Sequence, residues 1–353
     1  MPNPSIAYPP RVSLARIPTP MQRLDRISRR MGVEIYIKRD DLTGMELSGN
    51  KIRKLEFVLA HARETECDTV ITCGGAQSNH ARATAVAAAR LGLKSLLFLR
   101  TEDPRNPPPV SGNILLDRMA GAQIEWITPE AYRHRDRLMA DAADSLKEQN
   151  QKAHVIPEGA SDASGAWGYI GAFEELAKDI AAIRPGIESN TTVIHATGSG
   201  GTCAGLLIGA ALLESDIRIA TVNVCDDRDY FKEVIGGICG RFFESYPEQP
   251  PANLMDRLEI VDGYVGRGYG LSRSEELELI CRVAREEGMF LDPVYTGKAF
   301  YGMMKELEKD RRRFGERIVF IHTGGVFGLF PKSQDISAVL TQIGRASCRE
   351  RVC

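Results

Sequence analysis

The chain has 353 residues, of which 43% are hydrophobic and 26% are charged, and its formal net charge is −2. These values are ordinary for a globular protein of one large or two smaller domains, and they indicate neither nucleic acid nor a membrane as a partner. The first twenty residues lack the apolar core of a signal peptide, and no apolar run is long enough to span a membrane. We therefore expect a cytoplasmic protein.

Eight cysteines are scattered along the chain without the paired spacing of a metal site, which predicts reduced thiols and no metal centre. The last ten residues, 344–353, are basic, lack periodicity and contain two of these cysteines. We interpret them as a non-native tail and leave them out of the fold prediction.

Strand and helix patterns alternate along the rest of the chain. Helical spacing over Met21–Met31 precedes an alternating strand at 33–40, and helical spacing resumes at Lys51. Further strands are expected at 69–75, 94–100, 122–128, 153–159, 191–198, 218–226, 258–264 and 316–325. Helices are expected at 79–91, around Leu115, before 153, after Gly201, at 275–287 and after Gly297, with a second series beginning near Trp167. This alternation predicts an α/β fold of open, twisted parallel sheets covered by helices on both faces.

Glycine-rich junctions follow several of these strands, where parallel sheets bind their ligands. The clearest is TGSGGTCAG, from Thr197 to Gly205, which precedes a helix. Successive glycines let backbone N–H groups converge on an anion, and the helix terminus adds a favourable dipole. This junction predicts a phosphate site, although a tight turn without a ligand would have the same composition.

A second junction places Gln77, Ser78 and Asn79 at the mouth of an alanine-rich helix. Their donors could hold a carboxylate, but ordinary N-capping by Ser78 or Asn79 is an equally good interpretation. His80 fits a helix-packing residue better than a metal ligand, because no histidine with suitable spacing accompanies it.

Two further junctions carry single polar side chains. Tyr295 stands before an expected helix start, and Thr323 follows the last strand. Tyr269 lies in the glycine-rich loop VGRGYGLS, which could cover a site. A buried tyrosine with a satisfied hydroxyl, or a mobile surface turn, would explain the two tyrosines without a ligand.

Lys51 opens a helix directly after Ser48-Gly49-Asn50. The helix dipole disfavours an ammonium group there and would lower its pKa, which favours the neutral amine that attacks carbonyls. Alternatively, Lys51, Arg53 and Lys54 are cations on a solvated helix face. An anion loop, an early lysine and a carboxylate-binding junction together suggest pyridoxal 5′-phosphate (PLP) and an amino-acid substrate.

The motifs IKRDDLTG, SGNKIRKLEF, GAQSNHARAT, ATGSGGTCAG, DPVYTGKA and IHTGG form a specific set. Over Pro18–Ile343 the chain resembles the D-cysteine desulfhydrase and 1-aminocyclopropane-1-carboxylate deaminase family of fold-type II PLP enzymes. The stretches VCDDRDYF and SEELELI look most like plant-type D-cysteine desulfhydrases. The resemblance implies a tryptophan synthase beta-like fold, with a large domain from 1–51 and 163–343, an inserted smaller domain at 52–162, and a homodimer.

The resemblance also implies roles for individual residues. Lys51 would be the Schiff-base lysine and would carry the substrate α-proton. The cofactor phosphate would lie against Thr197, Gly198, Ser199, Gly200, Gly201 and Thr202. Asn79 would touch the phenolic oxygen of the cofactor, and Thr323 would approach its ring nitrogen. The substrate would meet Gln77, Ser78, Asn79, Tyr269, Tyr295 and Thr296, with Ser78 and the two tyrosines counted as catalytic beside Lys51.

The implied reaction is β-elimination from D-cysteine to pyruvate, sulfide and ammonia. Family members that open the cyclopropane ring resemble one another in having glutamate where this chain has Thr296, and tend to have glutamine in place of His80. Gly159-Ala160-Ser161-Asp162 departs from the family's usual Gly-Gly-Ser-Asn, which leaves the exact substrate open. The alternatives are the ring-opening deaminase, a lyase for another β-substituted alanine such as cysteate, and a non-catalytic PLP carrier or ligand sensor.

Overall fold

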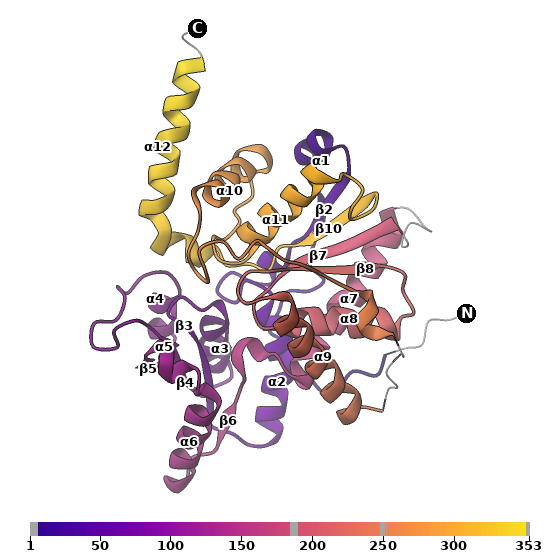
Figure 1. The fold of residues 1–353 in the computed structure, drawn as a ribbon. Coiled ribbons are helices and arrows are strands. Elements are labelled where there is room, and N and C mark those ends of the chain that lie inside the picture. Colours follow the sequence, from indigo (N-terminus) through magenta and orange to yellow (C-terminus); the bar gives the residue numbers. More distant parts are fainter. Residues whose placement is uncertain (1–5, 184–189, 248–250, 252, 351–353) are drawn as a thin grey trace.

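The computed structural model describes residues 6–183, 190–247, 251 and 253–350, with the backbone alone for 344–350. Two sheets and their covering helices make up the fold (Figure 1). The strands are β1 (Met21–Arg23), β2 (Glu34–Lys38), β3 (Thr69–Gly75), β4 (Lys94–Arg100), β5 (Gln123–Ile127), β6 (Ala153–Val155), β7 (Thr191–Thr197), β8 (Arg218–Asn223), β9 (Leu258–Val261) and β10 (Arg317–Ile321).

The α-helices are α1 (Asp25–Met31), α2 (Lys51–Glu64), α3 (Asn79–Arg90), α4 (Gly112–Met119), α5 (Pro129–Tyr132), α6 (Arg135–Glu148), α7 (Ala163–Ile183), α8 (Gly201–Leu212), α9 (Arg228–Ser245), α10 (Ser274–Glu287), α11 (Thr296–Lys309) and α12 (Ser333–Glu350). Short 3-10 helices are η1 (Asp40–Leu42), η2 (Glu158–Ala160), η4 (Leu254–Arg257) and η5 (Val326–Lys332).

The six-stranded sheet has the order β1-β2-β10-β7-β8-β9, and the four-stranded sheet has the order β5-β4-β3-β6. Every pairing is parallel except that of β1 with β2, which forms an antiparallel edge. The predicted α/β fold with parallel sheets is therefore confirmed. Because the strands run in parallel, their carboxyl ends share an edge, and the loops that follow them lie together.

Apolar side chains on opposite faces of the six-stranded sheet form two separate cores. Ile194 and Phe320 contribute to the core shared with α10 and α11, whereas Val193 and Val319 contribute to the core shared with α7, α8 and α9. This alternation follows from the two-residue period of a strand. The four-stranded sheet is similarly covered, by α2 and α3 on one side and by α5 and α6 on the other.

Two expectations for secondary structure were wrong. Met21 lies in strand β1, and the helix begins only at Asp25, because residues 21–23 pair with β2. No helix was expected between β8 and β9, yet α9 occupies 18 residues there. Asp227 caps this helix by accepting a hydrogen bond from the Tyr230 N–H.

The four-stranded sheet is built entirely from residues 69–155, so it interrupts the chain of the six-stranded sheet once. The exact domain boundaries at 51/52 and 162/163 stay a prediction. The backbone of α12 continues through 344–350 and extends away from the two sheets (Figure 1), while 351–353 lie outside the described residues. The non-native origin of 344–353 likewise stays a prediction.

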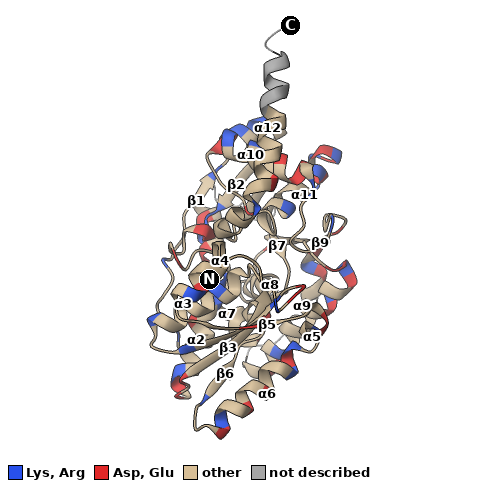
Figure 2. Ribbon diagram, turned by 90° about the vertical axis from the view of Figure 1, so that its left-hand side faces the viewer, with Lys and Arg blue, Asp and Glu red and all other residues tan. Residues whose placement is uncertain are grey.

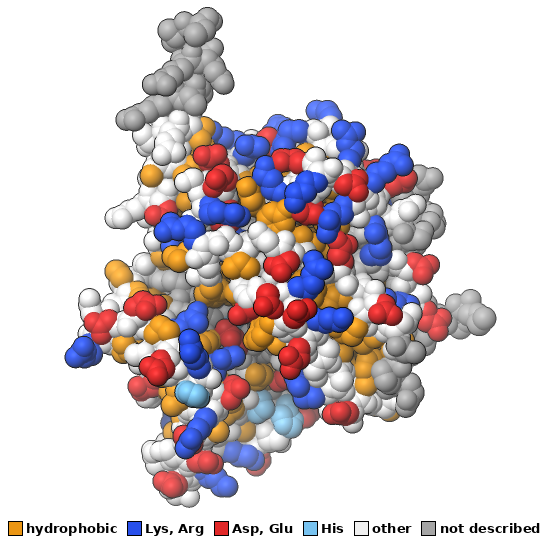
Figure 3. Space-filling view, viewed as in Figure 1, with side chains coloured by type: hydrophobic (Ala, Val, Ile, Leu, Met, Phe, Trp, Pro, Cys, Tyr) orange, Lys and Arg blue, Asp and Glu red, His pale blue; other side chains and the backbone are white. Residues whose placement is uncertain are grey.

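Charged residues of both signs are interspersed along the peripheral helices (Figure 2), and on the face that Figure 3 shows, Lys and Arg side chains are mixed with Asp and Glu side chains. In the part of the chain that the structure describes, no helix has the length and apolar character needed to cross a bilayer. The cytoplasmic location stays a prediction.

Candidate active site

The loops after β3, β7 and β10 converge with the start of α2 on one cavity. It is lined by Asn50, Lys51, Ser78, Asn79, His80, Glu158, Gly159, Ala196, Thr197, Gly198, Ser199, Gly200, Thr202, Tyr295 and Thr323. Ten of the fourteen residues selected from the sequence therefore lie on one surface. The four that do not line it are Gln77, Gly201, Tyr269 and Thr296.

Lys51 is the first residue of α2 and lies at the cavity wall. Its Nζ donates a hydrogen bond to Asn50 Oδ1 at 3.2 Å and lies 5.7 Å from the centre of the Tyr295 ring. Burial lowers the pKa of the Lys51 ammonium to about 8, although the charges of Glu158 and Asp292 oppose this effect. A minority of neutral amine is thus present near neutral pH, as the helix-start argument expected, but the main cause is burial and not the helix dipole.

Arg53 and Lys54 are almost completely buried, so the interpretation of both as cations on a solvated helix face is wrong. The Arg53 guanidinium forms ion pairs with Asp40 and Glu175, both at 2.8 Å. Through them α2 is joined to η1 and α7, which makes Arg53 a structural residue of the fold.

Lys54 has no such partner and lies one hydrogen bond behind the cavity wall, because Ser161, which it contacts, is hydrogen-bonded to the lining residue Ser199. Its Nζ donates one hydrogen bond, to Ser161 Oγ at 3.3 Å, and no carboxylate of the described residues lies within 4 Å of it. Burial, together with the charge of Lys51, lowers the pKa of Lys54 well below its ordinary value. A buried ammonium with spare donors is best satisfied by an anion. The sequence signal was available, because Lys54 follows Lys51 by three residues and shares its helix face.

The glycine-rich segment 198–202 forms a turn between β7 and the amino terminus of α8. Gly200 has φ +80°, and a Cβ there would lie 2.9 Å from Val234 Cγ1 of α9, so this glycine is needed for the turn and for packing. The segment is packed equally closely against the residues of η2 and the loop that follows it. A Cβ on Gly159 would lie 2.4 Å from Ser199 Oγ, and one on Gly201 would lie 2.6 Å from Ser161 Oγ.

Ser78 caps α3, because its Oγ accepts a hydrogen bond from the Ala81 N–H at 3.1 Å. The N-capping interpretation is therefore confirmed, and the Ser78 hydroxyl still has its proton to donate into the cavity. Gln77 is committed elsewhere, since its Nε2 donates to Ser111 O at 3.0 Å and its Oε1 accepts from the Asn113 N–H at 2.9 Å. The geometry gives no support for Gln77 as a carboxylate-binding residue.

Tyr295 lines the cavity, and its hydroxyl lies 2.5 Å from that of Tyr269. Burial raises the pKa of both phenols, so both are protonated near neutral pH. The two rings pack against glycines at the carboxyl ends of β7 and β3, which belong to different sheets. A Cβ on Gly198 would lie 3.0 Å from Tyr295 Cε1, and one on Gly75 would lie 3.3 Å from Tyr269 Cε1. Tyr269 thus reaches the site through Tyr295.

Three comparisons with known proteins agree with this geometry. Residues 12–324 match the family model described as pyridoxal-phosphate dependent enzyme. The chain is 40% identical, over 96% of its length and 84% of the relative, to the Arabidopsis thaliana "Bifunctional D-cysteine desulfhydrase/1-aminocyclopropane-1-carboxylate deaminase, mitochondrial". It is 42% identical, over 92% of its length and 99% of the relative, to a Thermotoga maritima protein provisionally named 1-aminocyclopropane-1-carboxylate deaminase. A crystal structure of an ACC deaminase homologue superimposes with a TM-score of 0.82 at 36% identity, covering 94% of this chain and 96% of that one.

The chain belongs to the D-cysteine desulfhydrase/1-aminocyclopropane-1-carboxylate deaminase family of fold-type II PLP enzymes. The residues of the cavity fit the cofactor of this family. Lys51 would supply an amine for its aldehyde, and Lys54 with the amino terminus of α8 would supply the positive environment that a phosphate needs. Gly159, Gly198 and Gly201 form the part of this site that we call the glycine cradle. A Cβ atom at any of the three would lie 3.0 Å or less from a neighbouring atom.

Thr296, which was expected to meet the substrate, is fully buried and does not line the cavity. Its hydroxyl donates to Asp292 Oδ1 and accepts from the Asp292 N–H, both at 2.7 Å. Asp292 also accepts from the N–H groups of Val294, Tyr295 and Thr296, so its carboxylate is saturated within its own loop. The geometry does not support contact between Thr296 and a substrate, whereas Thr323 does line the cavity.

Sequence reasoning missed Glu158, a carboxylate on the cavity wall of this PLP-enzyme site. It begins η2 directly after Pro157 and lies 3.5 Å from Arg135 Nε. His80 is buried, and its Nε2 lies 2.8 Å from Thr72 Oγ1, which fits the expected packing role. Within the described ranges, no group of three or more His, Cys, Asp and Glu side chains could hold a metal ion.

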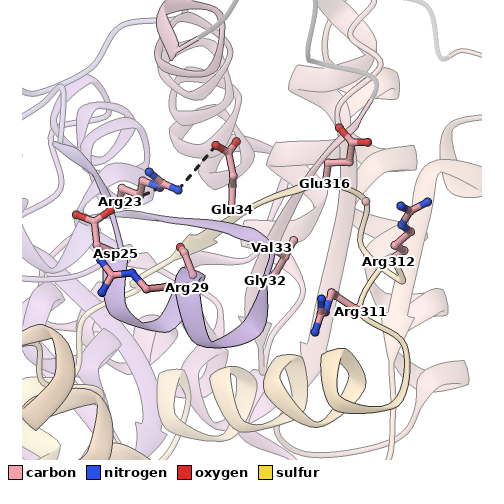
Figure 4. A pocket seen from close by; sticks show the side chains of 11 residues that line it. Arg23, Asp25, Arg29, Gly32, Val33, Glu34, Arg311, Arg312 and Glu316 are labelled. Carbon is pink, nitrogen blue, oxygen red and sulfur yellow. Dashed lines mark ion pairs between the residues drawn. The ribbon is translucent and has the colours of Figure 1, made fainter.

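A larger hollow lies at the opposite ends of the strands, near the starts of β2 and β10 (Figure 4). It is lined mainly by charged side chains, among them Arg23 and Glu34, which form an ion pair at 4.0 Å. None of the residues that line the PLP cavity is shared with it. The two hollows are separate, and the first is the one whose residues fit the cofactor of the family.

Proposed function

We propose that this protein converts D-cysteine to pyruvate, sulfide and ammonia by β-elimination. Membership of the family makes it a PLP-dependent enzyme, and the choice of substrate is the proposal. Bound PLP supplies an electron sink for the pair of electrons left on the α-carbon. The residues of this chain bind and orient the amino acid and move its protons.

Lys51 is the proposed carrier of the α-proton. Its lowered pKa provides the neutral amine that a base at neutral pH requires. Ser78 and Asn79 lie on the same wall, where Ser78 presents a donor to the substrate carboxylate and Asn79 presents one to the phenolic oxygen of the cofactor. Tyr295, with Tyr269 behind it, holds a phenolic proton at the place where the departing sulfur would need one.

The single observation that carries the proposal is the neutral wall after β10. Thr323 faces the cavity there, while the nearby Asp292 carboxylate is consumed by four hydrogen bonds to the start of α11. A neutral group leaves the ring nitrogen less positive than a carboxylate would, so the electron sink is shallower. A shallow sink suits the expulsion of a good leaving group such as a thiolate better than the opening of an unactivated ring.

The second candidate is 1-aminocyclopropane-1-carboxylate deamination, which the names of the Arabidopsis and Thermotoga relatives favour. Cysteate is a weaker candidate, because Glu158 on the cavity wall would repel its sulfonate. A non-catalytic PLP carrier or sensor would not need the buried tyrosine pair beside Lys51.

Side-by-side kinetics decide between these candidates. We expect keto acid and sulfide from D-cysteine, and negligible ammonia from 1-aminocyclopropane-1-carboxylate, when purified protein is assayed with D- and L-cysteine, cysteate and the ring compound. Lys51→Ala is the inactive control. Comparable efficiency on both substrates, or preference for the ring compound, would refute the proposal. We also propose a homodimer, which sedimentation or light scattering of the same preparation tests directly.

A further inference from the structure

A chain of hydrogen bonds connects Arg82 of α3, through Asn113 of α4, to Asn79 on the cavity wall. This arginine of α3 is fully buried, and its Nε donates to Asn113 Oδ1 at 3.2 Å while its Nη2 donates to Ser48 O at 2.8 Å. A guanidinium has donors and no acceptor. Arg82 therefore requires that Asn113 present its amide oxygen.

Asn113, the second residue of α4, is also fully buried. Because its oxygen is taken, its Nδ2 can only donate in the other direction, and it donates to Gln77 O and to Asn79 Oδ1, both at 2.9 Å. Every polar atom of this side chain is thus satisfied. The orientation of the Asn113 amide is fixed by partners that cannot exchange roles.

The orientation of the Asn79 amide is fixed in the same way, and Asn79 lines the cavity. Its Oδ1 is occupied by Asn113, so the part of its amide that remains for a ligand is the N–H donor. Its Nδ2 lies toward the loop after β10, where a Cβ on Gly325 would be 3.1 Å from it. Asn79 accordingly offers a donor to an oxygen acceptor in the cavity.

The start of α4 is held in place from two sides. Gly112 has φ +55°, and a Cβ there would lie 2.7 Å from both Gln77 Oε1 and Phe327 O of η5. Gln77 in turn binds the Asn113 N–H and Ser111 O. Gln77 therefore has a structural role, because its hydrogen bonds hold the start of α4 against the loop between β3 and α3.

We infer that Asn113 is a positioning residue that fixes the Asn79 amide with its N–H toward the phenolic oxygen of the bound cofactor. The inference rests on the proposed role of Asn79 in the PLP site. Asn113 touches no cavity ligand itself. Because Arg82 can only donate, it fixes the orientation of the Asn113 amide, and Asn113 in turn fixes the orientation of Asn79, which lines the cavity.

The test is a double-mutant cycle read as the PLP dissociation constant of the apoenzyme, measured by the visible absorbance of the bound cofactor. Asn113→Asp is nearly isosteric and still accepts from Arg82, but it cannot donate to Asn79, so the Asn79 amide loses its fixed orientation. We expect PLP to bind about tenfold more weakly, which is the value of one hydrogen bond to a charged acceptor. In the Asn79→Ala background the same change should have no effect. Asn150→Asp, on the exposed surface, is the matched control.

Asn113→Ala adds no charge beside Arg82 and serves as a second variant if the first does not fold. It should show the same pattern, with a loss that disappears in the Asn79→Ala background. An equal loss in both backgrounds, or no loss in the parent background, overturns the inference. An Asn79→Ala protein that binds PLP as tightly as the parent also overturns it. The substrate proposal is tested separately, because D-cysteine turnover by the parent protein does not depend on this cycle.

Discussion

The hydroxyl oxygens of Tyr269 and Tyr295 lie 2.5 Å apart, shorter than the usual separation of two neutral hydroxyls. Burial raises the pKa of each phenol, so neither is ionised near neutral pH. The loop that carries Tyr269 is thereby tied to the start of α11. Both phenols therefore keep their protons beside Lys51, which lies close to the ring of Tyr295.

Tyr295→Phe and Tyr269→Phe should each retain the yellow cofactor and lower kcat for D-cysteine. Because a positioned acid is worth roughly 10²–10⁴-fold, we expect a loss of about 10²-fold or more for Tyr295→Phe and a smaller loss for Tyr269→Phe. Tyr301→Phe, on α11 outside the cavity, is the control. A folded but colourless Tyr295→Phe protein would contradict this division of roles.

The rate of PLP capture by the apoenzyme should rise with pH through about 8 and then level off, because only the neutral Lys51 amine attacks the aldehyde. The Glu158 charge raises the pKa of Lys51, so Glu158→Gln should move this midpoint to lower pH, whereas Glu130→Gln should not. Stopped-flow absorbance measures both. Borohydride reduction should fix the cofactor to the Lys51 peptide, and attachment at another lysine would refute the assignment.

Lys54→Gln should weaken PLP binding about 10–100-fold, since a hydrogen bond to a charged group contributes roughly 1.5–3 kcal/mol. Binding of pyridoxal, which lacks the phosphate, should change little. Titration of the apoprotein with the two compounds separates these effects. The exposed Lys178, paired with Glu174, provides the control Lys178→Gln. Equal losses for both compounds would mean that Lys54 does not face the phosphate.

Gly159→Ala and Gly92→Ala form a matched pair, because both glycines have positive φ, +70° and +72°. Each change should cost roughly 1–2 kcal/mol of folding free energy from the left-handed backbone. Only the Cβ at 159 meets Ser199 Oγ, whereas nothing lies within 4 Å of the one at 92. PLP affinity should therefore fall for Gly159→Ala alone. Equal affinities in the two variants would show that the cradle adjusts without loss.

Asp117→Asn should stabilise the fold more at pH 8.5 than at pH 5. Burial raises the pKa of Asp117 to about 8, and neither carboxylate oxygen has a hydrogen-bond partner. The native state keeps the proton that the unfolded chain loses above about pH 4, so this group favours folding at low pH and the benefit is lost as pH rises to about 8. Denaturant unfolding at both pH values, with Asp144→Asn as control, measures the difference. A gain that is the same at both pH values would contradict the assignment.

The sequence predicted the alternation of strands and helices and the residues at the strand ends, because both follow from local patterns. Thr197, Ser78 and Thr323 were identified in this way, and all three line the cavity. The β1 strand was missed because its three residues are defined only by their pairing with β2. Local spacing alone cannot show such a pairing.

Contacts between distant segments account for the remaining differences. Lys54 resembled a solvated cation because its burial depends on packing of α2 against α7, more than a hundred residues away. Gln77 resembled a ligand-binding donor because its true partners, Ser111 and Asn113, stand 34 and 36 residues later. The resemblance implied that Thr296 would meet the substrate, but its hydroxyl is bonded to Asp292, because a helix start turns consecutive side chains in different directions.

The central place of β10 in the six-stranded sheet determines when the enzyme can first become active during synthesis. Val319 of β10 pairs with Tyr36 of β2 on one side and with Val193 of β7 on the other, so the sheet stays in two pieces until residues 317–321 leave the ribosome. The loop before Lys51 cannot take its final position until the same residues are synthesised, since the Asn50 N–H donates to Thr323 O at 3.1 Å. The four-stranded sheet has all its strands by residue 155 and can assemble early. A nascent chain therefore carries a complete four-stranded sheet long before the loop in front of Lys51 is held in place.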